Sequence, residues 1–391
     1  MNDRVDTERH ATNLELFLDL VFVFAVTQVA EVLGDGERLT GIGRGVLLAW
    51  LVWWLWSQFT WLGTAIDLSS QSVSQLLVLA AVPLALLVAV AIPGAFDESA
   101  IWFAGAYLAA NLWSLAIQGR GLWAREASRR AWLQYAPVAI IAPCVLFFGA
   151  FFSRGPRTAI WTVVAMLNVV SALLASRRGA APQNEWTIDP LHFAERHSLF
   201  VIISLGEVLV AIGVAAAQDK LGPETVIGGF GAVAMACVLW WSYFAYVPSV
   251  IEARLRAAQG HDRAGIARNL FTFGHFPIIL GVVLYSVAAK HMMRAPYDHL
   301  RAFDLAIMAI SVASFVGGIL WLQWQNARWL ARERVAVIVA TGLWCGLVGR
   351  SIPGVAVIGA VAVALSITQV ILVRRFAGGS ANSELPGRSG D

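Results

Sequence analysis

Charged residues are scarce in this chain. Asp, Glu, Lys and Arg make up 14% of its 391 residues, while 58% of the residues are hydrophobic. Soluble domains carry about 25% charged residues, so this composition excludes an ordinary soluble protein. Little polar sequence remains for a soluble catalytic domain. The composition therefore predicts an all-α polytopic membrane protein.

Cysteine and the common catalytic signatures are also missing or rare. The three cysteines, Cys144, Cys237 and Cys345, stand far apart in apolar runs without nearby histidines, and we interpret them as small core residues. The chain has no phosphate-binding glycine loop, no CxxC pair, no HExxH and no nucleophile elbow. These absences argue against nucleotide-driven work, and no cofactor, metal or nucleic-acid partner is expected.

Long apolar runs are what the chain has in abundance. A helix needs about 20 apolar residues to cross a hydrocarbon core of ~30 Å, and such windows recur along nearly the whole sequence. Separated at their polar breaks, they predict twelve transmembrane helices. The predicted centres are Val23, Trp53, Leu84, Leu108, Ile141, Val164, Ile203, Val238, Leu280, Ile310, Ala340 and Leu365.

The loops predict how the chain is oriented. Residues 1–13 lack the pattern of a cleaved signal peptide, so the first span is expected to stay as an anchor. The loops 119–131 and 248–268 are rich in arginine, and the positive-inside rule then places both termini in the cytoplasm of a bacterial inner membrane. Residues 376–391 are expected to form a disordered cytoplasmic tail.

A faint internal duplication divides the spans into two sets of six. A shift of 180 residues aligns Glu15 with Glu195, and a shift of 194 aligns Pro83 with Pro277. The predicted repeats are residues 14–176 and 189–375, related by an axis along the membrane normal. A functional site is then expected where the two halves meet.

The first span, "LELFLDLVFVFAVTQV", carries polar residues at positions where a lipid-facing helix has none. Glu15 and Asp19 are four residues apart and share one helical face, while Gln28 points elsewhere. Charges inside a membrane normally face a protein interior or a water-filled path. The two carboxylates therefore suggest a proton or cation site. The alternative is that Glu15 only caps the amino-terminal end of its helix.

A second polar segment, "DPLHFAERHSLFVIISLGEVLVAIG", opens the seventh span. His192, Glu195 and Arg196 are close enough in sequence to interact with one another near the start of the helix. Glu207 is ~18 Å farther along the helix axis and so deep in the membrane, next to Gly206, which would admit another helix or an ion. The cluster is either part of a transport site or a clamp between helices.

Three further features are weaker candidates. His275 lies mid-span before Pro277, whose kink frees carbonyl groups that can line a cavity, although a lone histidine is more often a core residue. A stripe of Asn111, Ser114 and Gln118 is expected to make interhelical hydrogen bonds. The tryptophan-rich run "WLVWWLWSQFTW" is expected at an interface or along a lipid-facing or substrate-facing surface.

Together, these segments resemble a known family. "LELFLDLVFVFAVTQV", "HFAERHSLFVIISLGEVLVAIG" and "GHFPIILG" are similar to the motifs of the bacterial low temperature requirement A (LtrA) family of polytopic membrane proteins, over residues 12 to 375. Leu18 and His197 depart from the family's pattern. The matching positions are Glu15, Phe17, Asp19, Phe22, His192, Glu195, Arg196, Leu205, Gly206, Glu207, His275 and Pro277. The family is named for a cold-growth phenotype, so the resemblance implies no molecular activity.

The leading functional prediction is a secondary transporter or channel in which intramembrane carboxylates bind or relay a proton or small cation. Its candidate site residues are Glu15, Asp19, Gln28, His192, Glu195, Arg196, Glu207 and His275. One alternative is an intramembrane enzyme that acts on a lipid or isoprenoid by acid catalysis. Another is a structural membrane-stress protein. The expected partners are membrane lipids and a small cation, a proton or a small hydrophobic substrate, and a homo-oligomer is left open.

Overall fold

The structure is a computed structural model of the whole chain. It describes residues 10–35, 39–66, 72–123, 126–178, 188–218, 222–258, 260–327 and 330–383. Within these ranges the chain is helical, and the one pairing of extended backbone is an isolated bridge between His299 and Pro353. The predicted all-α class is confirmed.

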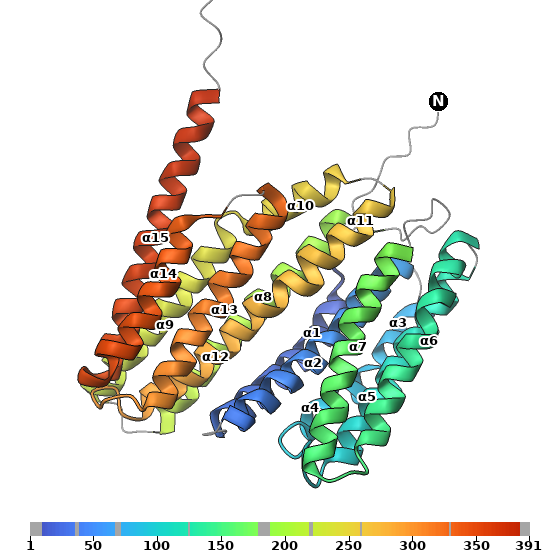
Figure 1. Ribbon diagram of the computed structural model, residues 1–391, viewed down its shortest axis with the longest axis horizontal. Coiled ribbons are helices and arrows are strands. Elements are labelled where there is room, and N and C mark those ends of the chain that lie inside the picture. The colour runs from blue at the N-terminus through green and yellow to red at the C-terminus, as the bar shows by residue number, and fades with distance from the viewer. Residues whose placement is uncertain are drawn as a thin grey trace, which may run out of the picture.

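The helices run back and forth along one direction (Figure 1). The first half contains α1 (Asn13–Asp35), α2 (Leu39–Ala65), α3 (Ser72–Leu79), α4 (Val82–Ala91), α5 (Ala100–Leu122), α6 (Glu126–Gly149) and α7 (Arg154–Arg178). The second contains α8 (Pro190–Gln218), α9 (Pro223–Phe244), α10 (Val247–Ala257), α11 (Gly260–Ala267), η1 (Arg268–Phe273), α12 (Gly274–Arg294), α13 (Ala302–Ala327), α14 (Arg332–Leu343), η2 (Trp344–Val348), η3 (Gly349–Ser351) and α15 (Gly354–Ser383).

Twelve helical stretches in the described residues are long and apolar enough to cross a membrane, and each predicted centre falls within one of them. Several of these spans are broken. The third is α3 followed by α4, and the ninth is α11, η1 and α12 in succession. The end of the bundle where His10 lies is called the first end below, and the opposite end the second end. Both α10 and the turn from α13 to α14 lie at the first end (Figure 1).

Prolines accompany the break in the third span of each half. Pro83 occupies the first turn of α4, where its missing N–H costs nothing. Pro277 lies inside α12, shortly after the π-helical turn η1. A π-turn widens the helix and is often found at functional sites. The backbone irregularity near His275 is therefore a π-turn that precedes it, whereas the sequence predicted a kink at Pro277.

The two halves meet through a small set of helices. Helix α1 packs on α8 and α12, and α2 also contacts α12. Helix α7 also touches α11, and the other main contacts lie within one half. The first half forms one side of the bundle and the second half the other (Figure 1). The central helices α2 and α12 are accordingly the most buried of the spans.

Burial corrects two expectations about side chains. Cys144 and Cys237 are exposed on the outside of the bundle, so only Cys345 is the core residue that was expected of all three. The tryptophan-rich run on α2 does not form a lipid-facing surface, because Trp53 and Trp56 are buried inside the bundle. Exposed Leu, Ile, Val and Phe side chains cover the outer helices, as expected for a surface in contact with lipid.

The termini differ in extent from the expectation. Helix α15 continues to Ser383, which is eight residues into the segment predicted to be a disordered tail. Residues 1–9 and 384–391 lie outside the described residues.

Candidate functional site

The beginning of α1 is fixed by a hydrogen-bonded cap. The Thr12 N–H and hydroxyl donate to Glu15 Oε2 over 2.9 and 3.0 Å, and the Glu15 N–H donates to Thr12 Oγ1 over 3.3 Å. This is a capping box, in which a Thr and a Glu three residues apart satisfy each other's backbone groups. Glu15 therefore does cap its helix, as the alternative interpretation expected. Its other carboxylate oxygen remains for a second role.

That second role is an ion pair with Arg196, which joins the two halves. Arg196 on α8 donates through Nη1 to Glu15 Oε1 and through Nη2 to Asp19 Oδ1, each over 2.7 Å. All three side chains are buried, with at most 2% of their surface exposed. Because Glu15 and Asp19 share one face of α1, a single planar guanidinium reaches both.

His192 completes this cluster one helical turn before Arg196. Its Nε2 lies 3.0 Å from Glu15 Oε1 and 3.1 Å from Oε2, so the ring N–H donates to the carboxylate. His192 is positioned by Asp189, whose carboxylate accepts hydrogen bonds from the first backbone N–H groups of α8 over 3.0 and 3.1 Å. Glu15, Asp19, His192 and Arg196 are called the charged cluster below.

Gly63 on α2 was not foreseen from the sequence. A Cβ at this position would lie 2.7 Å from His192 Cε1 and 2.9 Å from Glu15 Oε1. Only glycine therefore lets α2 pack against this contact. The surrounding sequence "TWLGTAI" carries no signal for such a role, because a glycine near a helix end is common.

Glu195 lies apart from the charged cluster, against the expectation that it would interact with His192 and Arg196. Its Oε2 accepts a hydrogen bond from the Ala11 N–H over 2.8 Å and lies 3.3 Å from His10 Nδ1. Its side chain is 33% exposed at the first end. His192 and Arg196 are four residues apart and face α1 together, whereas Glu195 projects from another side of the helix.

Trp56 separates the charged cluster from a second group of polar rings. Its Nε1 donates to Asp19 Oδ1 over 2.7 Å, and its ring lies edge-on to His197 with centroids 4.9 Å apart. The ring of His197 in turn lies 5.1 Å from that of His275. His275 is thus one shell away from the carboxylates and makes no hydrogen bond to them.

Hydrogen bonds fix the tautomers of both histidines. His275 Nδ1 donates to the Leu270 carbonyl over 2.9 Å, so its Nε2 accepts from the Tyr243 hydroxyl over 2.8 Å. His197 Nδ1 donates to the Phe193 carbonyl over 2.8 Å, which leaves Nε2 as an acceptor. Leu270 belongs to the π-turn, so the irregular backbone supplies the hydrogen-bond acceptor for His275.

Two buried acceptor atoms of titratable groups in this region have no hydrogen-bond partner among the described residues. They are Asp19 Oδ2 and His197 Nε2, on either side of Trp56. Buried polar atoms are nearly always hydrogen-bonded, so each such exception needs an explanation. Both atoms carry a free lone pair on a group that can take up a proton.

Gln28 and Glu207 lie elsewhere. Both side chains are half-buried, and Glu207 lies close to Thr27 and Glu31 of α1, more than two helical turns beyond Asp19. Near the second end, Lys290 of α12 donates to both oxygens of Glu31 over 2.5 and 2.7 Å. Gly206 has open space beside it, with no atom within 4 Å of a Cβ placed there, so no described helix packs closely against it. Glu207 therefore belongs to a second, more exposed polar region.

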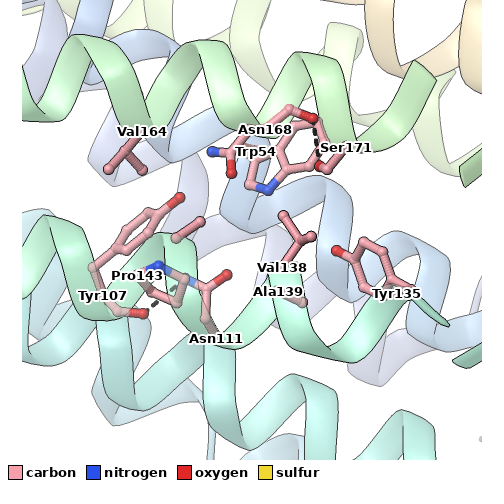
Figure 2. Close-up of a pocket in the computed structure, with 11 residues that line it drawn as sticks. Trp54, Tyr107, Asn111, Tyr135, Val138, Ala139, Pro143, Val164, Asn168 and Ser171 are labelled. Atoms are coloured by element: carbon pink, nitrogen blue, oxygen red, sulfur yellow. Dashed lines mark hydrogen bonds between the residues drawn. The ribbon is translucent and has the colours of Figure 1, made fainter. Parts of the chain in front are cut away.

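The polar stripe on α5 makes hydrogen bonds, and its first residue, Asn111, also lines a small cavity in the first half. Gln118 donates to the Gln58 carbonyl of α2 over 3.2 Å, as an interhelical role requires, whereas Asn111 bonds within its own helix to the Tyr107 carbonyl. Figure 2 shows Tyr107 and Asn111 facing Asn168 across a cavity of about 10 Å³. That is room for about one water molecule.

The described residues contain no group of three or more His, Cys, Asp or Glu side chains arranged to hold a metal ion. The charged cluster holds two carboxylates and one histidine, but Arg196 occupies the space between the carboxylates. The side chains of the charged cluster therefore suit proton exchange better than metal coordination.

Comparison with known proteins identifies the family of the chain. The family model described as bacterial low temperature requirement A protein (LtrA) matches residues 10–373, nearly the whole chain. The chain belongs to the LtrA family. An uncharacterized protein of Rhizobium meliloti (strain 1021) is 28% identical over 342 residues, which cover 82% of this chain and 79% of that protein. No solved structure matches.

The LtrA match spans both helices that build the charged cluster. It includes Glu15 and Asp19 on α1 and His192 and Arg196 on α8. Glu15 contacts His192 and Asp19 contacts Arg196, and the residues of each pair are 177 positions apart in the chain. The match thus identifies a multi-pass helical membrane protein of this family, and the function of the cluster must be argued from its own chemistry.

Proposed function

We propose that this LtrA protein is a proton-coupled secondary transporter and that the charged cluster is its proton site. The observation that carries the proposal is a buried set of two carboxylates and one guanidinium at the contact between the two halves. Transport sites in proteins built from two halves commonly lie at such a contact.

The charge balance of the cluster favours an exchangeable proton. Glu15 and Asp19 contribute two negative charges and Arg196 one positive charge, so one negative charge is left over when His192 is neutral. A net charge buried in a membrane protein is costly, and one added proton removes it. The unpartnered Asp19 Oδ2 offers a place for that proton.

The surroundings of the cluster support a route from the first end. Glu195 is partly exposed there and contacts His10 and Ala11, and the next residue, Thr12, donates to Glu15 of the cluster. On the far side of Trp56, the unpartnered His197 Nε2 and then His275 continue the line of titratable groups. These groups would exchange the proton when the halves move against each other.

An apolar layer favours a gated transporter over an open channel. Between Asp19 and the second polar region, the buried positions of α1 are Phe22, Val23, Ala25 and Val26. A proton or ion cannot cross such a layer without a change in packing. Binding at one end and release at the other would therefore need alternation between two arrangements of the halves.

The two alternatives have less support. Acid catalysis on a lipid needs a pocket open to the bilayer, yet the carboxylates are buried and the tryptophan-rich helix is packed in the core. A purely structural cluster needs no leftover charge and no unpartnered acceptors. Both alternatives predict that an imposed gradient has no effect.

The test is proton uptake into liposomes that contain the purified protein, driven by a potassium diffusion potential and followed with an internal pH dye. Asp19→Asn removes the leftover charge and keeps an oxygen for Trp56 and Arg196. We expect its proton flux to fall at least tenfold while its apparent Tm stays within a few degrees of the wild-type value. Infrared difference spectroscopy should show a protonated carboxyl signal that Asp19→Asn loses.

The matched control is Glu224→Gln, which neutralises an exposed carboxylate in the first turn of α9. It should leave both the flux and the infrared signal unchanged. Wild-type protein that is folded but gives neither gradient-driven flux nor a carboxyl signal would refute the proposal. A large loss of Tm in Asp19→Asn with unchanged flux would instead support the structural alternative.

A further inference from the structure

Another buried arginine, Arg334, has no counter-ion among the residues that the structure describes. It lies on the inward face of α14 with 3% of its surface exposed. Its Nε, Nη1 and Nη2 atoms have no hydrogen-bond partner. The contact that its guanidinium makes is with the ring of Tyr246, whose centroid lies 5.1 Å away. Five N–H donors are therefore buried without an acceptor.

The other buried arginines show how unusual this is. Arg196 faces two carboxylates, and Arg157 donates to the carbonyls of Ala150 and Phe152 over 3.0 and 2.7 Å. Breaking a buried ion pair and leaving one charge uncompensated typically costs several kcal/mol. A cation–π contact recovers only part of that cost.

The neighbours of Arg334 do not provide the missing charge. Glu333, the adjacent acid, projects differently and bonds through Oε1 to Arg375 over 2.8 Å. Gln323 lies in the last turns of α13, which precedes α14 through a short connection, and its buried Oε1 is likewise unpartnered. The region thus contains unsatisfied polar atoms from two adjacent helices.

The position of Arg334 favours the binding of a negatively charged ligand. It is the third residue of α14, and helical side chains lean toward the amino-terminal end, so its guanidinium lies over the positive end of the helix dipole. Helix starts and planar guanidinium groups both bind oxyanions, the second through two parallel hydrogen bonds. Tyr246, between α9 and α10, covers the guanidinium with its ring.

We propose that Arg334 and the first turn of α14 form a binding site for an anionic oxygen group, namely a phosphate. The phosphate can belong to a lipid headgroup in the adjacent leaflet or to a soluble molecule, and both present the same oxygens to the guanidinium. This site is separate from the charged cluster and does not depend on the proposed transport activity.

The test uses the full-length protein, purified and kept free of phosphate in a neutral detergent. Its apparent Tm is measured with added inorganic phosphate, with added phosphatidylglycerol and with added phosphatidylcholine. We expect phosphatidylglycerol or phosphate to raise the Tm of wild type by several degrees and zwitterionic phosphatidylcholine to raise it less. A rise with the lipid alone identifies a headgroup site, and a rise with both probes identifies a soluble-anion site.

Two variants assign the effect to Arg334. The shift should disappear in Arg334→Gln and persist in Arg120→Gln, which removes an exposed arginine of α5 outside the proposed site. Arg334→Met removes the buried charge, so without an anion its Tm should match or exceed that of wild type. When the anion is added, the Tm of wild type should rise above that of Arg334→Met, which should not change. The proposal is overturned if neither probe stabilises wild type, or if Arg334→Gln keeps the full shift.

Discussion

At the residue scale, the two acids Glu15 and Asp19 are held by one guanidinium from the other half of the molecule. The four-residue spacing of Glu15 and Asp19 correctly placed them on one face of a helix. Arg196 lies 177 residues from Asp19, and only packing of α1 against α8 brings them together. The sequence predicted instead that Arg196 interacts with Glu195, its neighbour along the chain, because a contact between distant segments leaves no local pattern.

Gly63 gives a prediction at this scale, because the space it leaves is what admits the contact between His192 and Glu15. Gly63→Ala puts a methyl group within 3 Å of both side chains, and such overpacking costs about 1–3 kcal/mol. We expect a lower free energy of unfolding and a reduced proton flux. Unfolding in detergent and the liposome flux assay measure the two effects.

Gly43→Ala on the same helix is the matched control, since no atom lies within 4 Å of a Cβ there. Alanine is the better helix former, so this variant should gain roughly 0.5–1 kcal/mol. If both variants behave alike, the close packing of α2 against the charged cluster is not important.

At the element scale, hydropathy was sufficient to find the spans, but it did not show which face of each helix points into the bundle. Twelve apolar windows became twelve helical spans because a bilayer leaves the backbone few alternatives. These helices are apolar around most of their circumference, so periodicity does not reveal which face is inward. The π-turn before His275 was equally invisible, because "RNLFTF" has no residue that requires it.

The start of α8 carries the prediction for this scale. Asp189 accepts hydrogen bonds from Leu191 and His192, and Pro190 suits the first helical position. Asp189→Ala removes this cap and should lower the free energy of unfolding by about 0.5–2 kcal/mol. Because His192 belongs to the released turn, the proton flux should fall as well.

Asparagine is an equally good capping residue, so Asp189→Asn should retain both stability and flux. Thermal unfolding and the liposome assay on the two variants separate the cap from the charge. Equal losses in both variants would mean that the negative charge of Asp189, rather than its hydrogen bonds, positions α8.

At the scale of the whole molecule, the packing of the two halves supports the internal repeat, which we propose as the origin of the fold. Helix α1 packs on α4 as α8 packs on α12, and α2 contacts α7 as α9 contacts α15. Pro83 and Pro277, paired by the sequence shift, both follow a break in the third span of their half. Under this relation the charged cluster joins the first helices of the two repeats.

Orientation in the membrane is the property on which the direction of any transport depends, and it gives the last prediction. An even number of spans puts both termini on one side, and the arginine-rich helix α10 lies at the first end. The first end should therefore face the cytoplasm. In a variant with all three cysteines replaced by alanine, Glu98→Cys, between α4 and α5, should react with an impermeant maleimide in intact cells. Arg254→Cys on α10 should react only after the membrane is opened, and the reverse pattern would place Glu195 and the route to the charged cluster outside the cell.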